Sequence, residues 1–195
     1  MRLGILGGTF NPVHLGHLIL AEEVREKKDL DRILFIPTFL PPHKTNGDIA
    51  AAGDRLQMVK AAIKGNRSFG VSDIEIRRKG PSYTIDTATA LKKQYPEDEL
   101  FFIIGSDLLN YLDEWKDLRQ IAGIVSFIVA TRPGYPLENI SRLVSSMKSG
   151  ISTIPIRAVD ISAFQIRECI RRGRSFRYLV PEAVFEYIEK KKLYR

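Results

Sequence analysis

The segment RLGILGGTFNPVHLGH (residues 2–17) joins a short apolar run to two glycines and then to a pair of histidines. The apolar run at residues 2–6 is typical of a buried strand, and the periodicity of residues 15–28 predicts a helix. Between them, Gly7 and Gly8 allow close approach of the backbone to a ligand and allow positive φ. Free N–H groups in such a turn and at a helix start can hold phosphate oxygens. The segment therefore predicts a strand–turn–helix unit that binds nucleotide phosphates.

His14 and His17 lie three residues apart at the start of this helix, so they share one face. They fit three roles: satisfied polar residues, metal ligands, or donors to a polyphosphate whose charge rises during reaction. A metal site is disfavoured because the helix offers no third ligand and lacks the glutamate of a zinc-protease helix. The turn has neither the three-glycine dinucleotide fingerprint nor the Gly-Lys-Ser/Thr of a Walker A loop. The favoured interpretation is a different kind of nucleotide-binding turn.

Apolar runs alternate with helical periodicity along the rest of the chain, which predicts further strands and helices. Strands are expected at residues 32–36, 69–77, 100–104, 124–130 and 151–156. Helices are expected at residues 54–64 (with Asp54 as cap), 84–94, 140–147, 165–172 and 181–192. Continuous apolar strands are typical of a parallel sheet that helices cover on both faces. We therefore predict an α/β fold with a doubly wound parallel sheet, whose ligands bind at the carboxyl ends of its strands.

Length and composition indicate a single domain, residues 1–195, in which residues 162–195 form a small C-terminal helical part. No apolar run approaches the roughly 20 residues of a membrane helix. The start of the chain has no signal-peptide pattern, so a cytoplasmic location and no membrane partner are expected. The single cysteine, Cys169, excludes an intrachain disulfide and a cysteine metal cluster, and we expect it to fill the core.

The net charge is +7, and residues 167–195 contribute nine Lys or Arg against four Glu, which is +5 of that total. Basic residues of this kind either form a solvated surface or attract phosphate-rich ligands. The chain has no run of five like charges, and its basic residues are not regularly interleaved with aromatic ones. These features disfavour nucleic acid as the partner.

Three further segments leave the ends of predicted strands. In PTFLPPHK (residues 37–44), two prolines stiffen a loop that carries His43 and Lys44, unless the loop is a plain surface connection. Gly105-Ser106-Asp107 is either a turn with an aspartate cap or a place where a carboxylate meets ribose hydroxyls or magnesium-bound water. Arg132 lies in the turn after the next strand.

Two more segments offer groups that suit contact with a ligand. SYTIDT (residues 82–87) begins a predicted helix, either through an ordinary Ser or Thr cap or with exposed N–H groups that bind a carboxylate. Trp115, the one tryptophan, lies in the polar stretch DEWKD, and an exposed indole suits stacking on a cationic ring.

GGTFNPVHLGH resembles the His-x-Gly-His motif of the nucleotidyltransferase superfamily. With the other segments, the chain resembles the bacterial nicotinate-mononucleotide adenylyltransferases over essentially its full length. The family often has Asp where this chain has Asn11, and both side chains can make the same local turn hydrogen bond. In DISAFQIR (residues 160–167), Ser162, Ile166 and Arg167 match the family pattern, whereas residues 163–164 replace a common hydroxyl pair.

The resemblance implies a Rossmann-like nucleotidyltransferase fold and a reaction in NAD biosynthesis. ATP and nicotinate mononucleotide would give nicotinate adenine dinucleotide and pyrophosphate, with ATP and the mononucleotide as the partners. Mg²⁺ would be carried with ATP and held by ATP oxygens and water, because the chain shows no dedicated carboxylate cage. No protein metal site is expected, and a homo-oligomer is compatible with the sequence.

The resemblance also implies roles for the matching residues. The expected catalytic residues are His14, His17, Lys44 and Arg167; the histidines would steady the transferring phosphate, and the two longer cations the leaving pyrophosphate. The expected ATP contacts are Gly7, Gly8, Thr9, Phe10, His17, Gly105, Asp107, Arg132, Ser162 and Arg167. The expected contacts to the nicotinate nucleotide are His43, Lys44, Tyr83, Thr84 and Trp115.

Two alternatives remain open. The first is a sister adenylyltransferase that prefers nicotinamide mononucleotide or phosphopantetheine; SYTIDT and Trp115 argue against phosphopantetheine but leave the amide open. The second is a non-catalytic nucleotide-binding or RNA-binding module that uses the basic C-terminal region, against which the intact pair His14 and His17 argues.

Overall fold

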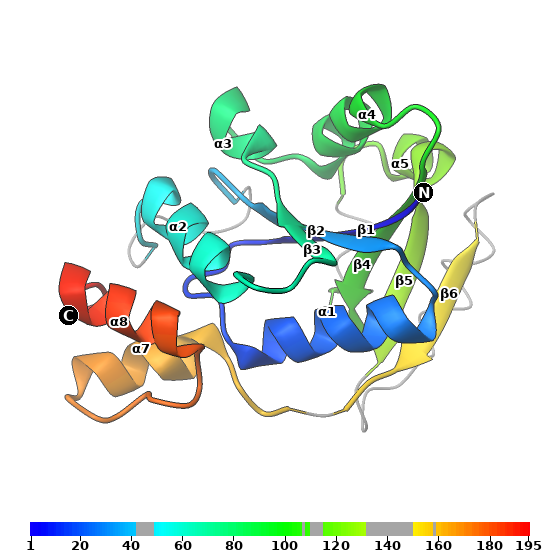
Figure 1. The fold of residues 1–195 in the computed structure, drawn as a ribbon. Coiled ribbons are helices and arrows are strands. Elements are labelled where there is room, and N and C mark those ends of the chain that lie inside the picture. The colour runs from blue at the N-terminus through cyan, green and yellow to red at the C-terminus, as the bar shows by residue number, and fades with distance from the viewer. Residues whose placement is uncertain (42–48, 107, 110–114, 132–149, 158) are drawn as a thin grey trace.

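The computed structural model describes residues 1–41, 49–106, 108–109, 115–131, 150–157 and 159–195. Its strands form one parallel sheet in the order β3-β2-β1-β4-β5-β6 (Figure 1). They are β1 (Arg2–Gly8), β2 (Arg32–Pro37), β3 (Phe69–Val71), β4 (Glu99–Gly105), β5 (Ser126–Thr131) and β6 (Ile151–Pro155). The predicted doubly wound parallel sheet is confirmed, and its order reverses between β1 and β4, where such folds bind ligands.

Helices cover both faces of this sheet (Figure 1). They are α1 (Leu15–Lys27), α2 (Ala52–Ala62), α3 (Ile74–Arg78), α4 (Thr84–Gln94), α5 (Leu118–Ile124), α7 (Ala163–Arg171) and α8 (Glu182–Lys191). One hydrophobic core joins strand residues such as Phe35 to α1, α2, α7 and α8. The other joins residues such as Leu34 to α4 and α5. Successive strand residues thus feed opposite cores, which explains the continuous apolar runs in the sequence.

The C-terminal helices α7 and α8 share the first of these cores through Ile166 and Val184, among other residues. Cys169 is half-buried and packs against the same core. The division into one domain with a C-terminal subregion at 162–195 stays a prediction. In the parts of the chain that the structure describes, no helix has the length and apolar character needed to cross a bilayer.

The single strand predicted at residues 69–77 is wrong. β3 ends at Val71, and residues 74–78 form α3. Ser72 redirects the chain, because its N–H donates to the Phe35 carbonyl while its hydroxyl accepts from the N–H of Ile74 at 3.3 Å. The alternation of Ile74 and Ile76 resembles a strand but spans only this short helix.

Three other details differ from expectation. Residues 118–124 form α5, which was not predicted, and β5 begins at Ser126 rather than at 124. Ile121 is fully buried against the sheet, so packing stabilises a helix whose own periodicity is short. The N-cap of α2 is Ala51, and Asp54 lies inside the first turn. The helix predicted at 140–147 lies outside the described residues.

The carboxyl ends of three strands meet at one edge of the sheet. At the end of β1 and β2, Gly8 pairs with Pro37. β1 and β4 pair as far as Ile5 and Phe102, and each strand then continues for three more residues, to Gly8 and to Gly105. The loops that begin with residues 9, 38 and 106 therefore leave the sheet near the switch point. The glycines, prolines and histidines singled out in the sequence follow these ends.

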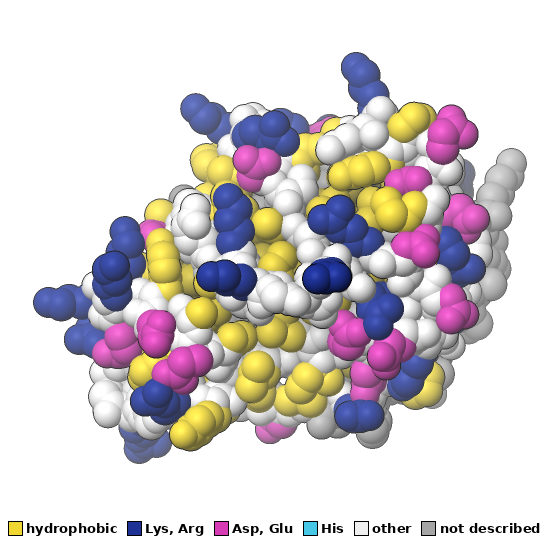
Figure 2. Space-filling view, viewed as in Figure 1, with side chains coloured by type: hydrophobic (Ala, Val, Ile, Leu, Met, Phe, Trp, Pro, Cys, Tyr) yellow, Lys and Arg dark blue, Asp and Glu magenta, His cyan; other side chains and the backbone are white. Residues whose placement is uncertain are grey.

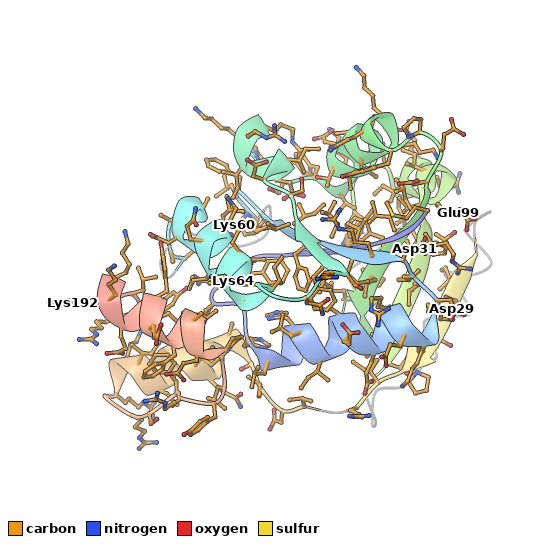
Figure 3. The ribbon with its side chains drawn as sticks, in the orientation of Figure 1. Asp29, Asp31, Lys60, Lys64, Glu99 and Lys192 are labelled. Atoms are coloured by element: carbon orange, nitrogen blue, oxygen red, sulfur yellow. The ribbon has the colours of Figure 1, made fainter. Side chains whose placement is uncertain are left out.

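Charged side chains are distributed over the whole of the face seen in Figure 2, with acidic and basic groups intermixed. In Figure 3, Asp29, Asp31 and Glu99 lie near the end of the sheet where β1 and β4 begin. The labelled lysines lie away from that end, on α2 (Lys60), just after α2 (Lys64) and just after α8 (Lys192). Basic residues also stand at the first end, since β1 begins at Arg2 and β2 at Arg32.

Candidate active site

A buried phenylalanine anchors the loop that follows β1. Phe10 is 2% exposed, and its ring lies edge-on to His17, with ring centroids 5.1 Å apart. Its φ of +47° lies in the left-handed region, where bulky residues are uncommon. A Cβ on Gly8 would lie 3.2 Å from this ring, so a side chain there would crowd it. Because the ring lies in the core, the predicted ATP contact of Phe10 would come from its backbone.

The two histidines form a closely packed pair at the start of α1. His14 is the N-cap and is 5% exposed, whereas His17 is half-buried. The N–H of His14 donates to Nδ1 of His17 at 3.2 Å, and the N–H of His17 donates to the carbonyl of His14 at 3.0 Å. Their rings stack with centroids 3.7 Å apart. The predicted shared face is confirmed, and because Nδ1 of His17 accepts, the N–H of its neutral ring is at Nε2.

Arg167 of α7 reaches back to the same loop. Its Nη1 donates to the carbonyl of Asn11 at 2.8 Å, although the two residues are 156 positions apart in the sequence. The Asn11 side chain is also held from a distance, since its Oδ1 accepts from the N–H of Ala50 at 2.9 Å. This tertiary bond joins two loops, unlike the local turn bond expected from the sequence, and an aspartate would accept it equally well. The structure thus brings Arg167 to the His14–His17 loop.

The start of α7 differs from the family pattern at the positions noted in the sequence. Ser162 is the N-cap, and its hydroxyl accepts from the N–H of Gln165, whose side chain accepts in turn from the N–H of Ser162. Phe164 is 61% exposed, and the Arg167 guanidinium lies 5.9 Å from its ring centroid. The hydroxyl of Ser162 is therefore engaged in capping, and Phe164 presents an aromatic surface beside the arginine.

The segment after β2 is tied to the segment before α4. The N–H of Phe39 donates to the hydroxyl of Ser82 at 3.0 Å, and the N–H of Ser82 donates to the carbonyl of Leu40 at 2.9 Å. Leu40 and Pro81 also form a parallel bridge. These bonds hold residues 38–41 against the start of SYTIDT. The contacts expected from His43 and Lys44, later in this loop, stay predictions, because both residues lie outside the described part of the chain.

The first turn of α4 has no side-chain cap. Tyr83 occupies the N-cap position and Thr84 the first helical position, and both are half-buried. Of the two alternatives for this segment, the ordinary Ser or Thr hydroxyl cap is not observed, and the hydroxyl of Ser82 instead accepts from the N–H of Phe39. The Lys116 ammonium lies 5.1 Å from the centroid of the Tyr83 ring. An uncapped helix start beside a cation suits the binding of a carboxylate.

Trp115 lies beside this helix start, because the neighbouring Lys116 contacts Tyr83. The indole is half-buried and packs edge-on against Phe102 and Phe127, at centroid distances of 6.1 and 6.3 Å. The expectation of an exposed indole is thus only partly correct. One edge of the ring is fixed by the core, which would hold its plane in a constant orientation.

Several predicted site residues lie outside the described residues: His43, Lys44, Asp107 and Arg132. Of the segment after β4, Gly105 is half-buried and Ser106 is 6% exposed. Gly7, Gly8 and Thr9, at the end of β1 and just after it, are half-buried.

Sequence reasoning missed Arg55, the largest fully buried side chain described. Its Nε donates to the carbonyl of Ala50 at 2.9 Å, its Nη1 to that of Thr9 at 2.7 Å and its Nη2 to that of Phe39 at 3.0 Å. Burial lowers the pKa of its guanidinium from the ordinary value. A signal was present, since Arg55 precedes the buried residues Met58 and Val59 by three and four positions and so lies on their stripe.

Glu75 was also missed. It is 6% exposed, and the hydroxyl of Thr87, in the first turns of α4, donates to its Oε1 at 2.6 Å. Burial raises the pKa of this carboxyl, and the Thr87 bond offsets part of that effect. Arg78 donates to the Thr87 hydroxyl at 3.2 Å. No signal in the sequence indicated it, because residues 69–77 resembled a strand with Glu75 on its polar face.

The described residues contain no group of three or more His, Cys, Asp or Glu side chains that could hold a metal ion. The groups that the described residues offer near the ends of β1 and β2 are instead hydrogen-bond donors: imidazoles, guanidinium groups and backbone N–H groups. Such donors suit a metal that arrives already bound to a polyphosphate.

Comparisons with known proteins agree with this geometry. A family model described as cytidylyltransferase-like matches residues 5–168. The chain is 42% identical over its full length, and over 96% of the relative, to a probable nicotinate-nucleotide adenylyltransferase of Desulfitobacterium hafniense. A protein of the same description from Syntrophotalea carbinolica is 44% identical, over the whole chain and 98% of the relative.

Solved structures share the fold. A Plasmodium falciparum nicotinic acid mononucleotide adenylyltransferase, complexed with NaAD, superposes with a TM-score of 0.81 at 18% identity and covers 99% of this chain and 97% of its own. The predicted Rossmann-like nucleotidyltransferase fold is thereby confirmed. Together with the full-length relatives above 40% identity, these matches show that the chain belongs to the cytidylyltransferase-like family, among its nicotinate-nucleotide adenylyltransferases.

Proposed function

We propose that this site transfers the adenylyl group of ATP to nicotinate mononucleotide, with the residue roles given below. The 5′-phosphate of the mononucleotide attacks the α-phosphorus of ATP, a new phosphoanhydride bond forms, and pyrophosphate leaves. The observation that carries the proposal is the convergence of His14, His17 and Arg167 on the loop after β1. Relatives described as adenylyltransferases, and a structural neighbour complexed with NaAD, support the acceptor.

The phosphate end of the site acts by placement and charge neutralisation. The attacking phosphate is already an anion at neutral pH, so no general base is needed. Nε2–H of His17 donates to an oxygen of the transferring phosphate, where negative charge develops. Arg167 neutralises the leaving pyrophosphate, for which its planar fork is suited. Lys44 is assigned to the same task from the family resemblance alone. Placement of this kind supplies much of the barrier reduction in phosphoryl transfer.

The pyridine end of the site selects the acceptor. The N–H groups of the first turn of α4, around Thr84, face no side-chain cap and bind the nicotinate carboxylate. Trp115, with one edge fixed by Phe102 and Phe127, stacks on the pyridinium ring. His43 and Tyr83 complete this end in the same proposal.

Magnesium would be carried by the oxygens of ATP and by water, and it would share the charge of the triphosphate. The described donors fit this arrangement because they are cationic or N–H groups that bind phosphate oxygens, and none of the described clusters competes for the metal. The chain's own residues therefore orient the phosphates rather than the metal. We further propose a cytoplasmic location and no nucleic-acid partner. The assembly state is to be measured on the purified protein.

The test is pyrophosphate release from MgATP with three acceptors side by side: nicotinate mononucleotide, nicotinamide mononucleotide and phosphopantetheine. We expect kcat/KM to be highest with nicotinate mononucleotide, with nicotinate adenine dinucleotide formed in equal amount to pyrophosphate. A preference for the amide would overturn the assignment of the α4 start to a carboxylate. No release with any acceptor would overturn the reaction itself.

A further inference from the structure

One buried guanidinium joins the segments that we assign to the two substrates. Arg55 is 1% exposed and donates to the carbonyls of Thr9, Phe39 and Ala50. Thr9 belongs to the phosphate-binding loop after β1, and Phe39 to the segment after β2. All three nitrogens of the Arg55 fork are thus used on backbone oxygens of separate segments.

The contacts continue from Phe39 to the pyridine end of the site. Arg55 donates to the carbonyl of Phe39, and the N–H of Phe39 donates to the hydroxyl of Ser82 at 3.0 Å. Ser82 lies two positions before Thr84, the first residue of α4. A continuous path of hydrogen bonds therefore runs from Thr9, through Arg55 and Phe39, to the start of α4.

Among the residues that the structure describes, this guanidinium makes no ion pair with a carboxylate. Among the described residues, its hydrogen-bonding partners are the three carbonyl oxygens. Burial lowers the pKa of this guanidinium, and among the described residues Tyr194 and Glu75 oppose that effect. Burial raises the pKa of the Tyr194 phenol, which keeps that group neutral. A buried charge held only by carbonyls is costly for the fold, so a role in arranging these segments would explain its presence.

We propose that Arg55 is a positioning residue that fixes the phosphate-binding loop and the pyridine-binding segment relative to each other. It touches neither substrate; it aligns the attacking 5′-phosphate with the α-phosphorus by holding both segments at once. This inference rests on the proposed function, because alignment of two substrates has meaning only if both bind here.

The expected consequence is a loss in turnover that exceeds the loss in binding. Each segment would keep its own contacts to its own substrate, but their relative placement would change. A misplacement of about 1 Å can reduce turnover by roughly 100-fold. We therefore expect kcat per competent site to fall by about 100-fold in Arg55→Met, with much smaller changes in the KM values for ATP and for the mononucleotide. Arg55→Lys keeps the positive charge but lacks the planar fork of the guanidinium. Its kcat per competent site should therefore lie between those of Arg55→Met and the wild type.

The experiment compares both variants with the wild type and with Ile188→Ala. Ile188 is buried in α8, which packs on α2, the helix that carries Arg55. This control therefore destabilises the support of α2 without touching the three carbonyls. For each protein, competent sites are counted by titration with a non-hydrolysable ATP analogue, and kcat, both KM values and Tm are measured. Ile188→Ala should lower Tm and retain the wild-type kcat per competent site.

Ser82→Ala provides a second test of the same path, at a smaller cost to folding. It removes the acceptor of the Phe39 N–H, so the double variant Arg55→Lys/Ser82→Ala should lose less than the product of the two single effects on kcat. Wild-type kcat per competent site in Arg55→Lys, or independent effects of the two changes, would overturn the proposal. Failure of the wild type to form the dinucleotide would instead contradict the proposed function, so the two failures are distinguishable.

Discussion

The backbone N–H of His14 donates to Nδ1 of His17, and the two imidazole rings stack with their centroids 3.7 Å apart. This bond requires an unprotonated Nδ1 on His17, so the ring offers its N–H from Nε2. The spacing of three residues places both side chains in the first turn of α1, where His17 can reach back to the N-cap. The helix start therefore sets the tautomer of the residue that we assign to the transferring phosphate.

Replacing His17 by alanine should reduce kcat by about 100- to 1,000-fold, the loss typical of removing one donor to a developing negative charge. The fold should survive, because His17 is half-buried and its ring contributes one edge contact to Phe10. Pyrophosphate release at saturating substrates measures the first effect and circular dichroism the second. Turnover near that of the wild type would disprove the assigned role.

Gly16→Ala should lower turnover without lowering stability. A Cβ at this position would lie 3.0 Å from Nδ1 of His14, so the stacked ring must shift by a few tenths of an ångström. Gly16 is the second residue of α1, and helices favour alanine over glycine by at most roughly 1 kcal/mol, which offsets this crowding. We expect a lower kcat together with an unchanged or higher Tm.

Gly53→Ala is the matched control for that substitution. It lies in α2, and an added Cβ there meets no atom within 4 Å. It should therefore show the stability effect without the change in kcat. Equal kcat values in the two variants would mean that the position of His14 does not matter for turnover.

The fold was predictable because its signals are local and repeated. Continuous apolar runs at residues 2–6 and 100–104 indicated strands covered on both faces, and both cores are observed. The helix at 84–94 was predicted with its observed bounds. The strand predicted through Glu75 was wrong because the chain turns after β3, where the N–H of Ile74 donates to the hydroxyl of Ser72, and α3 begins at Ile74.

The site was predictable only where chemistry is concentrated in one segment. The histidine pair is visible from its spacing, whereas Arg55 acts through carbonyls 46 and 16 residues away as well as one nearby. Such bonds depend on how the loops meet after folding. The same holds for Trp115, whose polar neighbours in sequence suggested exposure but whose ring edge packs on Phe102.

Trp115→Ala should weaken binding of the pyridine nucleotide and leave that of ATP unchanged. Loss of a ring stacked on a cation costs about 1–2 kcal/mol, so KM for nicotinate mononucleotide should rise by roughly tenfold. Trp115→Phe is the control, because it retains an aromatic face and contact with the core. The KM for each substrate is measured with the other saturating, and an equal rise in both values would indicate a general disturbance of the fold.

Tyr187→Phe should destabilise the packing of α8 on α2. The Tyr187 hydroxyl donates to Oδ1 of Asp54 at 2.7 Å, and such bonds to charged groups contribute about 1.5–3 kcal/mol. Burial, with this bond, raises the pKa of Tyr187 from 10.0 to about 12. A raised folded-state pKa means that this contribution is complete below pH 10 and is lost as the pH rises toward 12. Urea unfolding should therefore show a difference between the two proteins that shrinks across this window, and a constant difference would contradict it.

Glu75→Gln should stabilise the protein at neutral pH. Burial raises the pKa of the Glu75 carboxyl above its ordinary value of 4.5, although Thr87, Ser82, Arg78 and Arg55 face it and oppose the rise. Above pH 4.5 the unfolded chain loses this proton while the folded chain still holds it, so the wild type loses stability as the pH rises.

Glutamine stays neutral and can still accept the hydrogen bond of Thr87, so the variant escapes that loss. Its advantage in Tm should therefore be absent near pH 4.5 and should grow as the pH increases, until the folded carboxyl of the wild type is itself ionised. Glu97→Gln, at an exposed position, controls for the loss of one acidic group. Thermal unfolding of the three proteins across this pH range measures the effect. An advantage that is largest at low pH would contradict this prediction. It would mean that the fold favours the carboxylate form of Glu75, whereas burial disfavours that form.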